Sequence, residues 1–183
     1  MAKNEQQDSG SSSARSERFV DGILRRCQDD KGFAARLRRA DNPATEYQSW
    51  EILASFGVDI SRDYQRLPFA TVGAAIARSK AAENGSIGLG EAVAACYDDG
   101  NESSQAKARI RRILACHDIE EVCRVLRPVL SLIASRVDVP VDYKLLLRQL
   151  LGFKWNRRRV QLQWAQNFYS RSFAKGISEE DGA

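Results

Sequence analysis

The sequence contains a single histidine, His117, and no pair of cysteines with the close spacing typical of metal sites. Zinc sites generally combine such pairs with further histidines, and nucleophilic triads need a histidine beside an acid. No partner for His117 is apparent, and no serine or cysteine lies in a G-x-S-x-G context. No acidic pair has a spacing that indicates a metal. The residues therefore favour a binding protein over an enzyme, with no metal or cofactor.

Long apolar runs are also missing. No run approaches the roughly 20 residues that span a bilayer, and the N-terminus lacks the apolar segment of a signal peptide. We therefore expect a cytoplasmic protein without a membrane partner. In a reducing compartment the four cysteines are expected to stay reduced on apolar helix faces. They are Cys27, Cys96, Cys116 and Cys123.

Proline and glycine are scarce, with 4 and 12 among 183 residues. Ala, Leu, Arg, Glu and Gln are common, and this composition favours helix. Apolar residues recur at helical spacing along most of the chain. The sequence predicts an all-α protein, a compact bundle of about eight or nine helices over residues 17–173, with 17–100 and 101–173 as candidate halves. The polar segments 1–16 and 174–183 are predicted to be disordered tails.

Prolines and capping residues set the expected helix boundaries. Asn42 and Pro43 are expected to start a helix that runs to about residue 56, and Pro68 to open one that runs to about residue 80. Pro128 lies inside a helical pattern and is expected to kink or split that helix. Asp142 is expected to cap the leucine-rich helix that follows.

The formal net charge of +4 conceals an asymmetry. Residues 103–175 contain 15 Lys/Arg and 5 Asp/Glu, whereas the remainder contains 13 and 19. A basic C-terminal half on a nearly neutral protein suggests an anionic partner for that half. A solvated helix surface is the alternative interpretation.

The densest positive charge, at residues 154–159, lies between a leucine-rich helix and an apolar stripe. The stripe consists of Val160, Trp164 and Phe168, which recur at i, i+4 and i+8. The apolar residues must pack against the rest of the protein, while the basic run favours an anionic surface. We interpret the chain as a helical scaffold that holds arginines against a phosphate backbone.

Five blocks of sequence, in their order and spacing, resemble the CasB family, the small subunit of the type I-E CRISPR Cascade complex. The resemblance covers about residues 17–173 and implies an all-helical subunit without enzymatic activity, acting in antiviral defence. The blocks are 37–43 (LRRADNP), 86–92 (SIGLGEA), 108–114 (ARIRRIL), 126–130 (LRPVL) and 164–169 (WAQNFY).

The resemblance also implies partners. In the family, two copies of the small subunit associate end to end and contact the large subunit and the backbone subunits that carry the guide RNA. Their basic surfaces help to hold the guide RNA–target DNA heteroduplex and the displaced DNA strand. Two departures from the family pattern are Ala115 and Pro128, which stand where the family often has a basic residue.

The candidate nucleic-acid contacts come from the matching blocks or from the basic runs. Arginine suits backbone contacts because its planar guanidinium group binds phosphate oxygens at two positions. Trp155 is the one candidate for stacking on bases, with a core tryptophan at a helix junction as the alternative. The predicted nucleic-acid-binding residues are Arg38, Arg39, Arg109, Arg111, Arg112, Arg127, Lys154, Arg157 and Arg158.

Two other classes of function remain open. A helix-turn-helix regulator would use residues 108–114 as its recognition helix and would need base-edge contacts and a dimer that fits palindromic half-sites. The lack of Asn, Gln and Ser among the arginines argues weakly against that function. A helical adaptor that binds only protein is the other alternative. Nucleic-acid affinity that does not change when Arg109 and Arg112 become Ala would support it.

Overall fold

The computed structural model describes residues 5–170, with side chains from residue 14, while residues 1–4 and 171–183 lie outside it. Over the described residues the chain forms eight α-helices and two 3-10 turns and has no strand, which confirms the all-α prediction. The helices are α1 (Glu5–Asp29), α2 (Lys31–Leu37), α3 (Trp50–Ser55), α4 (Asp63–Ser79), α5 (Leu89–Ala95), α6 (Ser104–Leu114), α7 (Ile119–Arg136) and α8 (Tyr143–Tyr169), with the turns η1 (Glu46–Ser49) and η2 (Gly100–Glu102).

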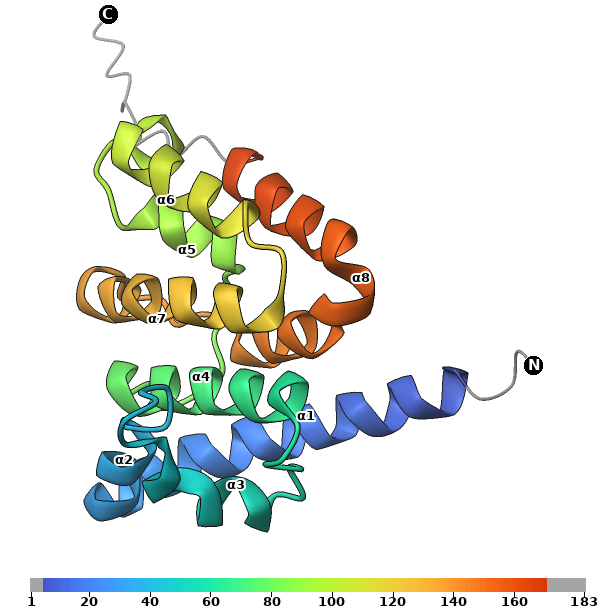
Figure 1. Cartoon of the computed structure of the whole chain (residues 1–183). Coiled ribbons are helices and arrows are strands. Elements are labelled where there is room, and N and C mark those ends of the chain that lie inside the picture. Colours follow the sequence, from blue (N-terminus) through green and yellow to red (C-terminus); the bar gives the residue numbers. More distant parts are fainter. Residues whose placement is uncertain (1–4, 171–183) are drawn as a thin grey trace, which may run out of the picture.

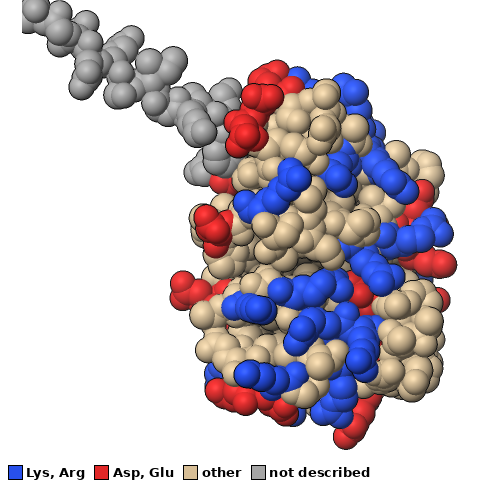
Figure 2. All heavy atoms as spheres, turned by 90° about the vertical axis from the view of Figure 1, so that its left-hand side faces the viewer, with Lys and Arg blue, Asp and Glu red and all other residues tan. Residues whose placement is uncertain are grey.

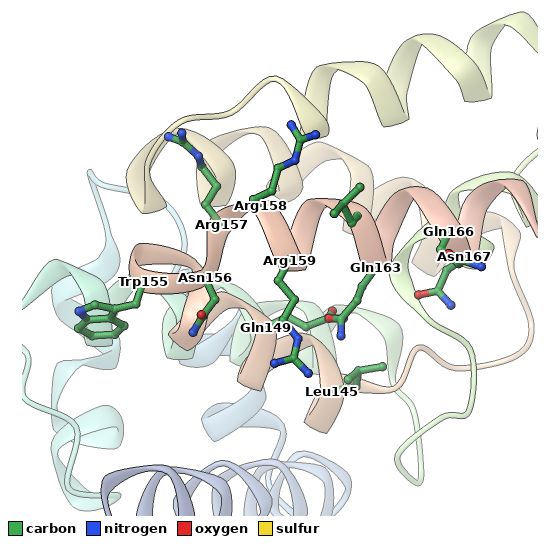
Figure 3. Close-up of a pocket in the computed structure, with 11 residues that line it drawn as sticks. Leu145, Gln149, Trp155, Asn156, Arg157, Arg158, Arg159, Gln163, Gln166 and Asn167 are labelled. Carbon is green, nitrogen blue, oxygen red and sulfur yellow. The ribbon is translucent and has the colours of Figure 1, made fainter. Parts of the chain in front are cut away.

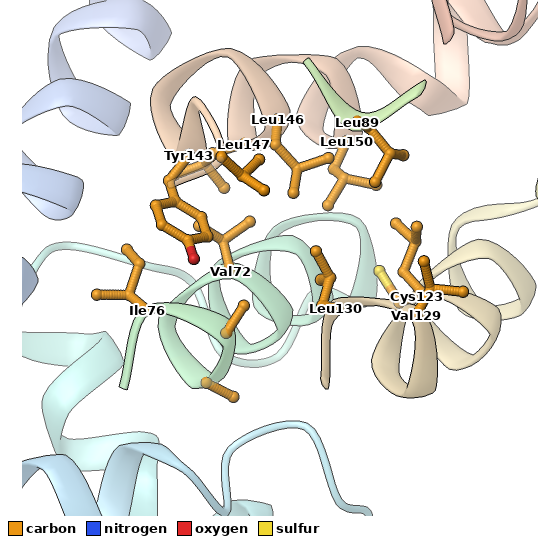
Figure 4. Close-up of a cluster of buried hydrophobic side chains, with 14 of the residues drawn as sticks. Val72, Ile76, Leu89, Cys123, Val129, Leu130, Tyr143, Leu146, Leu147 and Leu150 are labelled. Atoms are coloured by element: carbon orange, nitrogen blue, oxygen red, sulfur yellow. The ribbon is translucent and has the colours of Figure 1, made fainter. Parts of the chain in front are cut away.

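The helices are stacked in layers, and α8 connects the upper layers to the lower ones (Figure 1). Helices α1, α2 and α3 form the base, α4 lies on them, and α7 and the first half of α8 lie on α4. The second half of α8 packs with α5 and α6 at the top. The buried apolar residues form one continuous cluster, in which side chains from α4, α7 and α8 meet (Figure 4). Thus α5, from the first candidate half, packs against helices of the second.

Helix α4 is the central element of the core. Every residue from Pro68 to Ala77 is buried, as expected for a helix that is covered on all sides. Its many small residues, including Ala70, Ala74 and Gly73, allow neighbouring helices to approach closely. At Gly73, an added Cβ would lie 3.0 Å from Cδ1 of Leu37. This packing places α2 and α7 on either side of α4, next to its last turn.

Helix α8 is one element with a kink at Asn156, whose φ and ψ are −127° and 30°. It begins as predicted at Asp142, whose carboxylate accepts the Leu145 N–H at 2.9 Å. The apolar stripe continues across the kink, and Phe153 and Val160 are both buried. In a straight helix, Arg157 would lie on the same side as Leu150, which is buried seven residues earlier. The bend keeps the Arg157 guanidinium group at the surface, which avoids the cost of burying a charge.

Two proline predictions are wrong because tertiary packing and local turns outweigh proline preferences. Pro43 starts no α-helix, because the Asn42 side chain accepts the Ala44 N–H at 3.2 Å in a local turn. Pro68 lies in the second turn of α4, which begins at Asp63. The Arg62 carbonyl accepts the N–H groups of Gln65 and Arg66, and Asp63 pairs with Arg66 at 2.8 Å.

The predicted break at Pro128 is also wrong, because α7 runs from Ile119 to Arg136 without interruption. Pro128 and Arg124 are both exposed, so water can hydrate the Arg124 carbonyl that lacks its helical partner. The N-terminal tail differs from the prediction as well. Residues 5–16 belong to α1, and Ser16 is already buried. The predicted tail 174–183 lies outside the described residues.

Gly90 allows α5 to lie directly on the backbone of α8. A Cβ at this position would stand 2.2 Å from the Trp164 carbonyl oxygen and 2.6 Å from the Phe168 nitrogen. We expect Gly90→Ala to cost about 1–3 kcal/mol of stability, because α5 and α8 must separate. Gly152, inside α8, has no atom within 4 Å of such a Cβ, so Gly152→Ala should stabilise by about 0.5–1 kcal/mol. Urea unfolding of both variants measures the two changes in stability. Changes of the same sign and size in both variants would contradict the prediction.

The four cysteines form no disulfide; Cys96, Cys116 and Cys123 are buried, and Cys27 is partly buried against the core. Burial raises the pKa of Cys27, Cys96 and Cys116 to about 11 and that of Cys123 to about 12. Because thiol reagents attack the thiolate, we expect native modification at pH 8 to be roughly 100-fold slower than modification of the unfolded chain. Time-resolved thiol titration with and without denaturant measures this ratio. Rapid labelling of any thiol in the native protein would contradict the expectation.

Candidate nucleic-acid interface

Two arginines, Arg78 of α4 and Arg127 of α7, reach the carboxylate of Asp41, and two more, Arg38 and Arg39, lie in the turn just after α2. We call this group the Asp41 cluster. The Asp41 side chain is 3% exposed. It accepts two hydrogen bonds from the Arg78 guanidinium group, one of them at 3.1 Å, and its Oδ1 lies 3.7 Å from Nε of Arg127. Arg78 also donates to the Arg38 carbonyl at 3.3 Å, and Arg39 donates to the Gln48 side chain at 2.7 Å. The cluster consists of Asp41, Arg38, Arg39, Arg78 and Arg127.

The Asp41 cluster leaves positive charge at the surface. Arg38 and Arg39 are exposed, and the Arg127 side chain is 43% exposed although it faces Asp41. One carboxylate cannot neutralise four guanidinium groups. The side of the molecule on which α2 and the C-terminal end of α4 lie carries a broad band of Lys and Arg, with Asp and Glu mainly at its edges (Figure 2). Three predicted residues from two distant blocks, Arg38, Arg39 and Arg127, are therefore brought together.

Helix α6 carries the second group of arginines. One of them has a side-chain hydrogen-bond partner, and the other two are exposed without an ion pair to a described residue. Arg109 donates to the Tyr97 hydroxyl and is half-buried. Arg136 lies 5.7 Å from the centre of the Tyr97 ring and donates to the Cys96 carbonyl at 3.3 Å. Arg111 and Arg112 are exposed near the end of α6 and form no ion pair with any carboxylate in the described residues. The two predicted residues Arg109 and Arg112 are therefore not equivalent, because only Arg112 presents a free guanidinium group.

The third group lies at the kink of α8. Arg157, Arg158 and Arg159 line a surface hollow of about 790 Å³ together with Gln149 and Gln163. Figure 3 shows Arg157 and Arg158 projecting to one side of the helix and Arg159 to the other. Arg157 also donates to the carbonyl of His117 at 2.8 Å, in the turn that follows α6. This bond connects the kink to the end of α6, where Arg111 and Arg112 lie.

Trp155 is on the surface beside these arginines. Trp155 is 63% exposed, so the alternative of a core tryptophan is wrong. Trp155 lies seven residues after the exposed Arg148, on the same side of the first half of α8 and outside the apolar stripe. The ring contacts Tyr64 from α4, with 5.5 Å between ring centres.

Sequence reasoning missed several basic residues that complete these groups. Arg78 and Arg136 stand alone in the last turns of α4 and α7, and no local pattern marks them because their partners are distant in the chain. Arg159 continues the run of Arg157 and Arg158 and was detectable from that run. Among the described residues, no group of His, Cys, Asp and Glu is placed to hold a metal ion. No helix there is both long and apolar enough to cross a membrane.

The family model of the CRISPR-associated protein Cse2 matches residues 34–169. The chain belongs to the Cse2 family. This assignment confirms the resemblance found in the sequence blocks. A search of curated proteins gives no match.

Solved structures share the Cse2 fold. CasB from Thermobifida fusca is 19% identical, with a TM-score of 0.63 over 87% of this chain and 96% of that one. CasB from M. ruber is 25% identical, with a TM-score of 0.66 over 85% and 93%. A chain of a CRISPR RNA-guided surveillance complex is 20% identical, with a TM-score of 0.66 over 86% and 92%.

The two departures from the Cse2 pattern occupy exposed positions. Ala115 caps the C-terminus of α6, and Arg111 lies four residues before it on the same side of the helix. Pro128 lies on α7, and Arg124 lies four residues before it on the same side of that helix. Burial raises the pKa of the Cys116 thiol, and the charges of Arg112 and Arg124 act against that rise. Basic residues one turn away therefore flank both departures.

Proposed function

We propose that this Cse2-family chain is the non-catalytic small subunit of a type I-E CRISPR RNA-guided surveillance complex, Cascade. The observation that carries the proposal is the family match over residues 34–169. A structural neighbour that is part of such a complex supports it. The partners are the backbone and large subunits and a second copy of this chain.

Within the complex, the subunit holds nucleic acid by its backbone. Base pairing between guide RNA and target DNA reads the sequence, so this subunit needs only to bind phosphates. The candidate contacts are the Asp41 cluster, the exposed end of α6 and the kink of α8. They bind the guide RNA–target DNA heteroduplex and the displaced strand without sequence preference. Arg111, Arg112 and Arg124 take over the charge that Ala115 and Pro128 do not supply.

Asp41 and Tyr97 support this function by fixing arginines in advance. Asp41 orients Arg78 and Arg127, and the Tyr97 hydroxyl orients Arg109. A guanidinium group that is already ordered loses less conformational entropy when it binds a phosphate. The groups without such partners, Arg111 and Arg112, supply charge rather than a fixed geometry.

Co-purification tests the assignment to the complex. The chain carries an affinity tag and is co-expressed with the other subunits and a guide RNA, with an unrelated tagged helical protein as control. We expect the guide RNA and the other subunits to be retained with the chain, and target DNA to remain uncut on incubation with the purified chain alone. A complex that assembles fully without the chain, and never retains it, would contradict the proposal.

Binding to unrelated duplexes separates the proposal from its alternatives. A subunit that contacts phosphates binds all sequences with similar affinity, whereas a helix-turn-helix regulator prefers one operator by a factor of roughly 10³ or more. A protein-only adaptor binds none of them. Fluorescence anisotropy with several labelled duplexes provides the comparison.

A further inference from the structure

Trp155 and Tyr64 form a small aromatic surface that is surrounded by cations. The two rings meet edge to face, with 79° between their planes. Nζ of Lys154 lies 4.9 Å from the centre of the Tyr64 ring and 5.5 Å from that of Trp155. Arg62 donates to the Tyr64 hydroxyl at 2.8 Å. We call these four residues the Trp155 platform.

The platform fixes Trp155 and leaves much of its ring free. In an edge-to-face contact the edge of one ring meets the face of the other, an arrangement that the ring quadrupoles favour. Because the residue is still 63% exposed, a flat molecule can stack on it. The kink at Asn156 and the start of α4 hold the platform in place, so little ordering remains to be done on binding.

Cations for phosphates lie beside the platform. Arg157 and Arg158 follow Trp155 on α8 and line the hollow at the kink (Figure 3). Arg158 forms no ion pair with a carboxylate of the described residues. Asp59 and Asp63, the acidic residues that flank Arg62 and Tyr64 in the sequence, pair with Arg62 and Arg66.

We infer that the Trp155 platform is a stacking site for an unpaired base of single-stranded nucleic acid, whose phosphates contact Lys154, Arg157 and Arg158. The inference rests on the proposed function and assigns to one surface the part of the nucleic acid that lacks a pairing partner. Sites for single strands combine basic grooves with exposed aromatic rings, because every base has a face that can stack. A paired duplex buries those faces and leaves the ring without a partner.

A protein partner is the competing occupant, and the surroundings of Trp155 argue against it. Tryptophans that anchor protein interfaces lie near the centre of the contact, where charged residues and especially lysine are depleted. Here Lys154 lies against the ring itself, and Arg157 and Arg158 follow within one turn. This pattern of charge fits a polyanion better than a protein surface.

The test measures binding of a labelled oligothymidylate and of an abasic strand of equal length to the full chain. The variants are Trp155→Ala, Trp155→Phe and, as matched control, Trp50→Ala, which removes a tryptophan that is 37% exposed on α3. Trp155→Ala should weaken binding to oligothymidylate by roughly 5- to 150-fold. Trp155→Phe should recover most of that loss, and Trp50→Ala should bind as the unsubstituted chain does.

Two further readouts distinguish stacking from charge. The dependence of affinity on salt should stay the same in Trp155→Ala, since no cation is removed, whereas Arg158→Ala should reduce the slope by about 0.7. On the abasic strand, the unsubstituted chain and Trp155→Ala should bind equally. A loss on the abasic strand as large as that on oligothymidylate would overturn the stacking site.

Other outcomes separate this inference from the proposed function. Equal affinities of the unsubstituted chain and Trp155→Ala for oligothymidylate would overturn the site and leave the proposed function standing. Loss of self-association without loss of strand binding would identify the platform as a protein contact and would also overturn it. Absence of any strand binding by the unsubstituted chain would contradict both proposals.

Discussion

Replacement of Trp164 by alanine is expected to destabilise the protein by about 3–5 kcal/mol, because the ring is fully buried. Trp164 stacks on Phe153 with 5.8 Å between ring centres and donates its Nε1–H to Gln149 at 2.7 Å. The substitution leaves a cavity and removes the donor to the Gln149 amide oxygen. Domains generally have only about 5–15 kcal/mol of stability, so the variant should be poorly soluble or partly unfolded. Urea denaturation followed by circular dichroism measures the change.

The matched control is Leu162→Ala, two residues earlier on the same half of α8. Leu162 is exposed, so its truncation should change stability by no more than about 0.5 kcal/mol. A fully stable Trp164→Ala variant would mean that Val160, Trp164 and Phe168 do not anchor α8 in the core. The packing of α8 would then not explain where Arg157, Arg158 and Arg159 lie.

The double substitution Arg111→Ala and Arg112→Ala is expected to weaken binding to an RNA–DNA heteroduplex by roughly 25- to 60-fold at about 0.1 M salt. The reason is electrostatic, since each phosphate contact releases condensed counterions and adds about 0.7–0.9 to the slope of log affinity against log salt. All sequences should be affected alike. Titration of the isolated chain into labelled heteroduplex at several salt concentrations measures both quantities.

The control for this pair is Arg25→Ala on α1, another exposed arginine that lies outside all three basic groups. It should leave affinity and slope nearly unchanged. Thermal unfolding should be the same for the double variant and the unsubstituted chain, since exposed arginines contribute little to stability. A double variant that loses stability as well as affinity would indicate that these residues act through the fold.

The helices and their buried faces could be predicted from sequence because their signals are local. The repeat of Val160, Trp164 and Phe168 predicts a buried stripe, and all three residues are buried. Asp142 predicts the start of α8, because a side-chain acceptor at that position satisfies a free N–H group. Predictions from single prolines failed at Pro43, Pro68 and Pro128, where local turns or packing decide the boundary.

The arrangement of the candidate interface could not be predicted, because it depends on long-range contacts. Arg78 and Asp41 are far apart in the chain and meet only when α4 packs against α2. Nothing in the sequence near Arg109 shows that the Tyr97 hydroxyl occupies its guanidinium group. The contact of Trp155 with Tyr64 of α4 likewise joins residues that are far apart in the chain, and no local pattern indicates it.

The most direct test of the central claim, that exposed arginines of this Cse2-family chain hold nucleic acid by its backbone, uses reconstituted complexes. Target-DNA affinity is measured at two salt concentrations for complexes containing the unsubstituted chain, the Arg111→Ala/Arg112→Ala variant or the Arg25→Ala control. We predict weaker retention and a smaller salt dependence for the double variant alone, with unchanged penalties for mismatches to the guide. Equal affinities and equal slopes for all three complexes would contradict the claim for the end of α6.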